Sequence, residues 1–160
     1  MSITKVYIPA EEVEAYLEAA LNGNTTEVSV MLNRRWYMVD VPSEDNDTAL
    51  MLATWNGNIE TMDMLCQHNA STFTTNDDNE NVFDQIPALE DTELMKLNHI
   101  LHGSRNEEIE TWNDPHRQYN RVMYERNHKD GGVWCSYQSE ETVHENISPY
   151  ESGMMMCTCP

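Results

Sequence analysis

Two short segments of the chain concentrate carboxylates, one at residues 44–47 and one at residues 77–80. The first is Glu44-Asp45-Asn46-Asp47 and the second is Asp77-Asp78-Asn79-Glu80, so both consist of two acids, an asparagine and a further acid. Carboxylates so close together suit the ligation of a cation or the attraction of a basic protein surface. A calcium loop also needs a glycine and a closing glutamate at fixed later positions, which are missing here. The segments therefore favour a partner with a basic surface.

The acidity extends to the chain as a whole. Its 160 residues include 28 Asp and Glu against 9 Lys and Arg, which gives a formal charge of −19. A small soluble domain usually carries a net charge of magnitude roughly 2–8. From Trp36 to Met95 the chain has acids but no Lys or Arg. Nucleic acids and anionic membranes are poor direct partners for such a protein because both are polyanions. Solubility alone is the other interpretation of the charge.

Residues suited to catalysis or metal binding are few. The sequence has no Gly-rich phosphate loop, His-Glu-x-x-His, Gly-x-Ser-x-Gly or Cys-x-x-Cys pattern. His99 and His102 share one face of a predicted helix, where exposed histidines are commoner than metal ligands. Four residues with irregular spacing could in principle ligate zinc, namely Cys135, His144, Cys157 and Cys159. We predict no enzyme, no cofactor and no metal site, with an enzyme whose site lies in the C-terminal segment as the alternative.

The sequence also bounds the size of the fold and its compartment. A chain of 160 residues has room for one domain. It begins with nothing that looks like a signal peptide, and no apolar run approaches the ~20 residues that span a bilayer. Four cysteines lack the density of a secreted disulfide scaffold. We therefore predict a cytoplasmic protein.

The first acidic segment leads into a pair of predicted helices. Asn46 occupies a turn position that often needs a positive φ, which asparagine tolerates. Thr48 is placed to cap the first helix, and Gly57 is placed to end it in the left-handed conformation. Residues 58–66 then form a second helix with apolar residues at i, i+3, i+6 and i+7.

This unit resembles the ankyrin repeat, which has a period of about 33 residues and consists of a turn and two antiparallel helices. Weaker copies flank it, with Gly23 matching Gly57 one period upstream and a helical stripe over 91–101 downstream. Residues 48–51 are Thr-Ala-Leu-Met where the family has Thr-Pro-Leu-His, and Pro87 makes the next first helix short or distorted. The resemblance covers about three degenerate repeats over residues 7–101. It implies an all-α fold, a short ankyrin-repeat stack with a C-terminal capping or extension segment.

The chain is expected to divide into three parts. These are the repeat domain 1–102, a C-terminal cap or arm 103–137, and a flexible tail 138–160. Within the cap we expect helices over 107–112 and 115–127. A short strand is expected over 133–137.

The role of the cap is open between two alternatives. In the first, its large side chains cover the exposed end of the last repeat, namely Trp112, Tyr119, Met123 and Trp134. In the second, the segment 103–137 is an arm that reaches a partner or a second copy of the chain. The basic stretch 96–129 could then dock on the acidic repeats of that neighbouring copy.

In ankyrin-repeat proteins the turn tips and the exposed end of the first helix generally form the concave binding face. The resemblance places this face on Glu44, Asp45, Asp47, Trp55, Asn56, Asp77, Asp78 and Glu80. Trp55 is either an aromatic anchor for a partner or a contact to an adjacent repeat.

Two functional hypotheses follow from this face. The first is a non-enzymatic inhibitor that occupies the basic, nucleic-acid-binding surface of a target such as a nuclease, as small, very acidic viral counter-defence proteins do. The alternative is an ankyrin adaptor that binds through Trp55 and apolar contacts, with its charge incidental.

Overall fold

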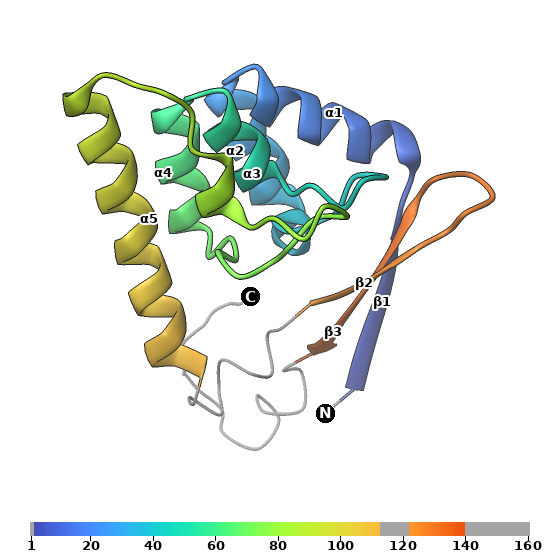
Figure 1. Cartoon of the computed structure of the whole chain (residues 1–160). Helices are drawn as coiled ribbons and strands as arrows, with labels where there is room; N and C mark the ends of the chain where they lie inside the picture. Colours follow the sequence, from blue (N-terminus) through green and yellow to red (C-terminus); the bar gives the residue numbers. More distant parts are fainter. Residues whose placement is uncertain (1, 113–121, 140–160) are drawn as a thin grey trace.

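The computed structural model describes residues 2–112 and 122–139. Those ranges contain five α-helices, two short 3-10 helices and three strands (Figure 1). In chain order they are β1 (Ser2–Ile8), α1 (Ala10–Leu21), α2 (Thr25–Arg34), η1 (Trp36–Met38), α3 (Ala49–Trp55), α4 (Ile59–Gln67), η2 (Val82–Gln85), α5 (Asp91–Trp112), β2 (Met123–Arg126) and β3 (Val133–Ser139).

Helices α1 to α4 form two helix pairs with matching ends. Gly23 follows α1 with φ of 76° and Gly57 follows α3 with φ of 70°, so both glycines take the left-handed conformation that ends a helix. The Thr48 hydroxyl accepts from the Met51 N–H at 3.3 Å and caps α3. The Asn24 side chain caps α2 in the same way. These local features confirm the predicted period and its helix ends.

The third unit is incomplete, as Pro87 predicts. Its first helix is reduced to the 3-10 turn η2, which opens with a capping box between Asn81 and Asp84. Its second helix, α5, continues through Gly103 to Trp112 and packs on α4. The helix predicted over 107–112 is therefore the end of α5 and not a separate element.

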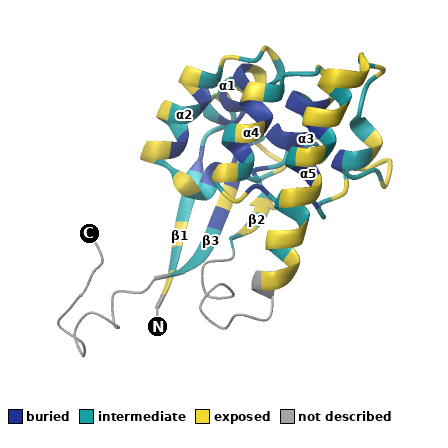
Figure 2. Ribbon diagram, turned by 90° about the vertical axis from the view of Figure 1, so that its left-hand side faces the viewer, coloured by how far each residue is buried: buried dark blue, intermediate teal, exposed yellow. Residues whose placement is uncertain are grey.

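The core lies between the helices. Its largest fully buried side chains include Tyr16 of α1, Leu50 of α3, Leu65 of α4 and Leu101 of α5. Figure 2 shows buried residues gathered in α1, α3 and α4, whereas α5 turns exposed residues to the outside. In the described part of the chain, no helix is both long enough and apolar enough to cross a bilayer.

The fold is not all-α, because β1, β3 and β2 form an antiparallel sheet in that order. β1 pairs with β3 from Ser2 opposite Ser139 to Ile8 opposite Val133, which brings the two ends of the described chain together. The strand predicted over 133–137 is confirmed as β3. The helix predicted over 115–127 is wrong for 123–126, which form β2, and residues 115–121 lie outside the described residues.

The sheet packs beside the first repeat. Ile8, Val133 and Cys135 are buried, and the Tyr124 hydroxyl of β2 reaches the backbone at η1. Figure 1 shows the sheet on the side of the molecule opposite α5. The C-terminal strands therefore return to the first repeat.

The expectation that Met123 and Trp134 cover the end of the last repeat is consequently wrong. Met123 is 67% exposed, and Trp134 lies on the same face of the sheet, where its ring contacts that of Tyr7 at a tilt of 55°, with the centroids 5.0 Å apart. That face points away from Val133 and Cys135, because successive residues of a strand alternate between its two sides. Of the other two residues predicted to form this cover, Trp112 ends α5 and Tyr119 lies outside the described residues.

Candidate functional site

The two acidic segments form the tips of two equivalent turns. In the first tip (residues 43–47) the Ser43 hydroxyl accepts from the N–H groups of Asp45 at 3.2 Å and Asp47 at 3.0 Å. In the second tip (residues 76–80) the Asn76 side-chain oxygen accepts from the N–H groups of Asp78 and Glu80, both at 3.0 Å. In both tips a short polar side chain therefore folds the turn around its own oxygen.

The asparagine in each tip takes the left-handed conformation, which the sequence predicted for Asn46. Asn46 has φ of 65° and Asn79 has φ of 61°, in the left-handed region that few residues other than glycine and asparagine enter. A backbone bond closes each turn, from Asn46 N–H to Ser43 at 3.0 Å and from Asn79 N–H to Asn76 at 2.9 Å. The two tips are thus the same structure, repeated one period later in the chain.

Direct hydrogen bonds join the two tips. The Asp77 N–H donates to the Asp45 carbonyl at 3.0 Å, and the Asn46 amide donates to the Asp77 carboxylate at 2.6 Å. The Asn76 amide donates to the Asp47 carboxylate at 3.0 Å. Figure 1 shows both tips pointing the same way, away from α5. The structure therefore brings the predicted acidic residues of both segments together on one surface.

The carboxylates differ in how far they are used inside the protein. Asp47 and Asp77 accept from the neighbouring tip, and Glu80 accepts from Gln85 at 3.1 Å. The outward carboxylates are exposed and accept no hydrogen bond from the described residues; they are Glu44, Asp45 and Asp78.

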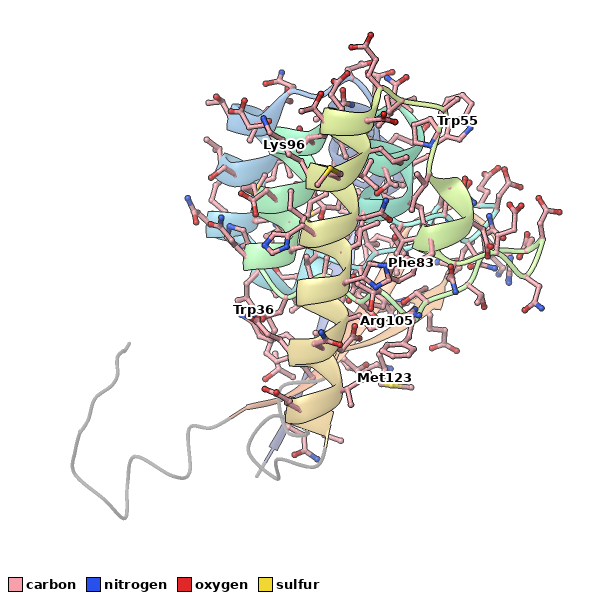
Figure 3. The ribbon with its side chains drawn as sticks, turned by 60° about the vertical axis from the view of Figure 1, so that its left-hand side comes forward. Trp36, Trp55, Phe83, Lys96, Arg105 and Met123 are labelled. Atoms are coloured by element: carbon pink, nitrogen blue, oxygen red, sulfur yellow. The ribbon has the colours of Figure 1, made fainter. Side chains whose placement is uncertain are left out.

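Trp55 and Asn56, the other two residues of the predicted face, lie at the C-terminal end of α3. Trp55 is 59% exposed, and Figure 3 shows its ring projecting from the molecule. The Asn56 side chain donates to the Leu21 carbonyl at 2.7 Å and so links the central repeat to the preceding one. Asn58 makes the same link at 2.8 Å. Asn56 therefore already has a role in joining the repeats.

Two residues that build this surface escape sequence reasoning. Ser43 and Asn76 fold the tips, yet they stand just before the acidic segments and were not predicted to matter. They occupy the same place relative to the two acidic segments, and both have short oxygen-bearing side chains. Those two features are the signal that could have identified them.

The cysteines and histidines considered for a metal site do not form one among the described residues. No group of three or more His, Cys, Asp or Glu in that part of the chain could hold a metal ion. Cys135 is buried in β3, where desolvation raises the pKa of its thiol to about 12. His144, Cys157 and Cys159 lie outside the described residues. Burial likewise raises the pKa of Cys66 to about 11, which makes this thiol unreactive.

Two members of the basic stretch are used within the protein. The Arg105 guanidinium lies over the rings of Phe73 at 4.1 Å and Phe83 at 4.2 Å, and Figure 3 shows Arg105 next to Phe83. Arg126 donates to the backbone carbonyls of Gly131 and Pro42. Neither guanidinium is therefore available as a docking group.

The family model described as ankyrin repeats, in three copies, matches residues 5–77. Residues 5–77 are thus similar to ankyrin repeats. Ankyrin repeats bind protein partners and are typically non-enzymatic, so residues 5–77 form a protein–protein interaction module. No curated protein and no solved structure matched the chain. The ankyrin match ends at the second tip, and α5, β2 and β3 lie beyond it.

Proposed function

We propose that the two joined tips form an acidic face that binds a basic surface on another protein. The observation that carries this proposal is the pairing of the tips, which gathers carboxylates from two repeats and leaves those of Glu44, Asp45 and Asp78 outward. Charges fixed on a paired backbone are pre-organised, so less conformational entropy is lost when a partner binds.

No carboxylate of the tips forms an ion pair with a described residue. Among the described residues, one ion pair is present, between Arg35 and Glu12 at 3.1 Å, and it lies beside α1 and α2. No Lys or Arg occurs from residue 36 to residue 95, which includes both tips. An acidic surface without ion pairs of its own mainly raises the association rate with a basic partner and sets which partners are rejected.

The sharper form of the proposal is an inhibitor of a nucleic-acid-binding protein. A surface that holds phosphates is basic, and a protein with a charge of −19 is suited to occupy it. Nucleases and other defence proteins present such surfaces, and a viral or phage counter-defence protein would act in this way. A cytoplasmic location is consistent with this role.

The proposal can be tested with two matched variants. The tip-neutral variant carries Glu44→Gln, Asp45→Asn and Asp78→Asn. The control variant carries Glu60→Gln, Asp63→Asn and Glu93→Gln, which remove the same charge from exposed positions on α4 and α5.

Each protein is immobilised, exposed to native lysate and eluted with a salt step from ~50 to ~300 mM. The eluted proteins are then identified by mass spectrometry. We expect a nucleic-acid-binding protein that is retained by the wild type and the control variant and lost by the tip-neutral variant. Equal retention by all three proteins would place the binding surface elsewhere.

The exposure of Trp55 supports a second candidate, an adaptor that binds through this ring. Aromatic residues with large accessible area are typical anchors of protein interfaces. For an adaptor, Trp55→Ala should abolish retention of a partner that resists ~300 mM salt, and the tip-neutral variant should still retain it. Loss of retention in the tip-neutral variant, with little effect of Trp55→Ala, would exclude the adaptor.

A further inference from the structure

Each acidic tip is preceded by an irregular segment that is held from outside the ankyrin match. The first lead-in segment, residues 37–42, enters the first tip at Ser43. The second lead-in segment, residues 70–75, enters the second tip at Asn76. Apart from Tyr37 and Met38, which end the 3-10 helix η1, neither segment lies in a helix or a strand, so the position of each tip depends on what holds the segment in front of it.

Strand β2 holds the first lead-in segment at both of its ends. The Tyr124 hydroxyl donates to the Tyr37 carbonyl at 2.5 Å and accepts from the Asp40 N–H at 3.2 Å. An N–H on one guanidinium nitrogen of Arg126 donates to the Pro42 carbonyl. Pro42 directly precedes the tip, so this bond acts on the last peptide before the acidic turn.

The same guanidinium is itself anchored. Its other terminal nitrogen donates to the Gly131 carbonyl at 3.1 Å, in the connection between β2 and β3. The planar fork of arginine can serve two carbonyls at once with little loss of side-chain freedom, which a lysine ammonium cannot match. Arg126 therefore ties the first tip to the sheet.

Helix α5 holds the second lead-in segment in a corresponding way. The Arg105 guanidinium donates to the Thr72 carbonyl at 2.6 Å and to the Thr72 hydroxyl at 3.3 Å. It is clamped between the rings of Phe73 and Phe83, the first of which belongs to the same segment. Figure 3 shows Arg105 and Phe83 at the face of α5 that turns toward η2.

A carboxylate of α5 completes this contact. Glu108 accepts from the Ser71 hydroxyl at 2.7 Å and from the Thr72 N–H and hydroxyl at 2.9 and 2.7 Å. The Ser71 N–H then donates to the Asp40 carboxylate at 3.0 Å, which joins the second lead-in segment to the first. The two lead-in segments are thus joined to each other as well as to their supports.

We propose that Arg105 and Arg126 are positioning residues that fix the two acidic tips relative to one another. Each guanidinium holds a backbone carbonyl of one lead-in segment, and charge-assisted bonds of this kind are the stronger hydrogen bonds in proteins. Only the benefit to binding rests on the proposed function; the positioning of the tips does not.

The experiment compares Arg105→Met and Arg126→Met with Arg34→Met. All three substitutions remove one positive charge and keep an unbranched stem. Arg34 is exposed at the end of α2, and its side chain makes no hydrogen bond or ion pair with the described residues. Hydrogen exchange measured by NMR on the isolated full chain reports the tip amides, because those of Asn46 and Asn79 are hydrogen-bonded in the folded turns.

We expect Arg126→Met to accelerate exchange at the first tip on the order of tenfold, and Arg105→Met to do the same at the second. Arg34→Met should change neither tip. Lysine at position 105 or 126 should give a smaller acceleration than methionine, because it keeps the charge but lacks the fork.

Unchanged tip exchange in both methionine variants would overturn the proposal. Equal acceleration at the buried helical amides of Leu50 and Met62 would also overturn it, since that result indicates a loss of overall stability. The measurement needs no partner. Selective acceleration without any basic target in the capture experiment would therefore leave the positioning intact and reject the proposed function.

Discussion

The two acidic tips are built alike but supported differently. Residues 43–47 and 76–80 fold through the same bonds, with a left-handed asparagine and a short side chain that accepts two backbone N–H groups. Their lead-in segments, by contrast, are held by a strand in one case and by a helix in the other. The turns recur because their bonds are local, whereas their supports come from distant parts of the chain and have no period.

The largest expected effect concerns the core of the repeats. Leu50 is fully buried in α3, so Leu50→Ala should lower the free energy of unfolding by about 2–5 kcal/mol. Ile109 on α5 is 48% exposed, and Ile109→Ala should change it by no more than about 0.5 kcal/mol. Urea titration measures both values. Similar losses for the two variants would mean that burial of the side chain in the core does not decide the loss.

The sheet offers the next largest effect. A Cβ at Gly132 would lie 2.0 Å from the Tyr7 hydroxyl oxygen, so Gly132→Ala must displace the Tyr7 ring, which packs against Trp134. We expect a loss of about 1–3 kcal/mol in urea unfolding. At Gly103 in α5 a Cβ would meet nothing within 4 Å, and Gly103→Ala should stabilise by up to about 1 kcal/mol. A harmless Gly132→Ala would show that β1 and β3 pack loosely.

The stability contributed by Asp40, which joins the two lead-in segments through the Ser71 N–H, should depend on pH. Burial, together with the negative charge of Glu108, raises the pKa of Asp40 to about 7, and the Ser71 N–H opposes this shift. Three other titratable groups interact electrostatically with Asp40, namely Tyr16, Cys66 and Tyr124. Because the folded-state pKa exceeds the unfolded value of about 3.9, the contribution of Asp40 to stability is lost as pH rises from about 4 to about 7.

Asp40→Asn removes this titration. Relative to the wild type, the variant should gain on the order of 2 kcal/mol in unfolding free energy between about pH 4 and about pH 7.5. Exposed Asp63 on α4 supplies the control, Asp63→Asn, which should show no such gain. Urea titrations at several pH values decide the matter, and a pH-independent difference between wild type and Asp40→Asn would contradict this account of Asp40.

The smallest expected loss of stability tests whether the two tips fold through equivalent turns. Asn46→Ala and Asn79→Ala each place a residue with a Cβ at a positive φ, and each should cost on the order of 1 kcal/mol. Glycine at either position should cost less, because it enters the left-handed region freely. Thermal unfolding of the four variants checks this. Alanine and glycine at 46 both lose the Asn46 bond to Asp77, so the difference between alanine and glycine at each position measures the turn itself. Clearly unequal differences at 46 and 79 would show that the supports, and not the turns, dominate local stability.

The repeats were predictable from the sequence because their signals are local. Thr48, Gly57 and the asparagines of the tips act on backbone within a few residues, and their types alone indicate caps and left-handed turns. The acidic residues of both segments were likewise placed on one surface, since the period determines which turns lie next to one another.

The sheet and the supports were not predictable in this way. β1 pairs with β3 from the opposite end of the described chain, and no local pattern in either strand indicates which strand will be its partner. Arg105 and Arg126 were grouped as a docking surface because a sequence shows their charge but not the carbonyls that they bind. The division of the chain after residue 102 stays a prediction.

The most direct test of the acidic face is the association rate of the captured target with the wild type, the tip-neutral variant and the control variant. Stopped-flow or surface-plasmon measurements at ~50 and ~300 mM salt would supply it. We predict that the tip-neutral variant associates at least about tenfold more slowly than the control variant at low salt, and that the difference shrinks at high salt. Equal association rates for the two variants would contradict a binding role for the tips.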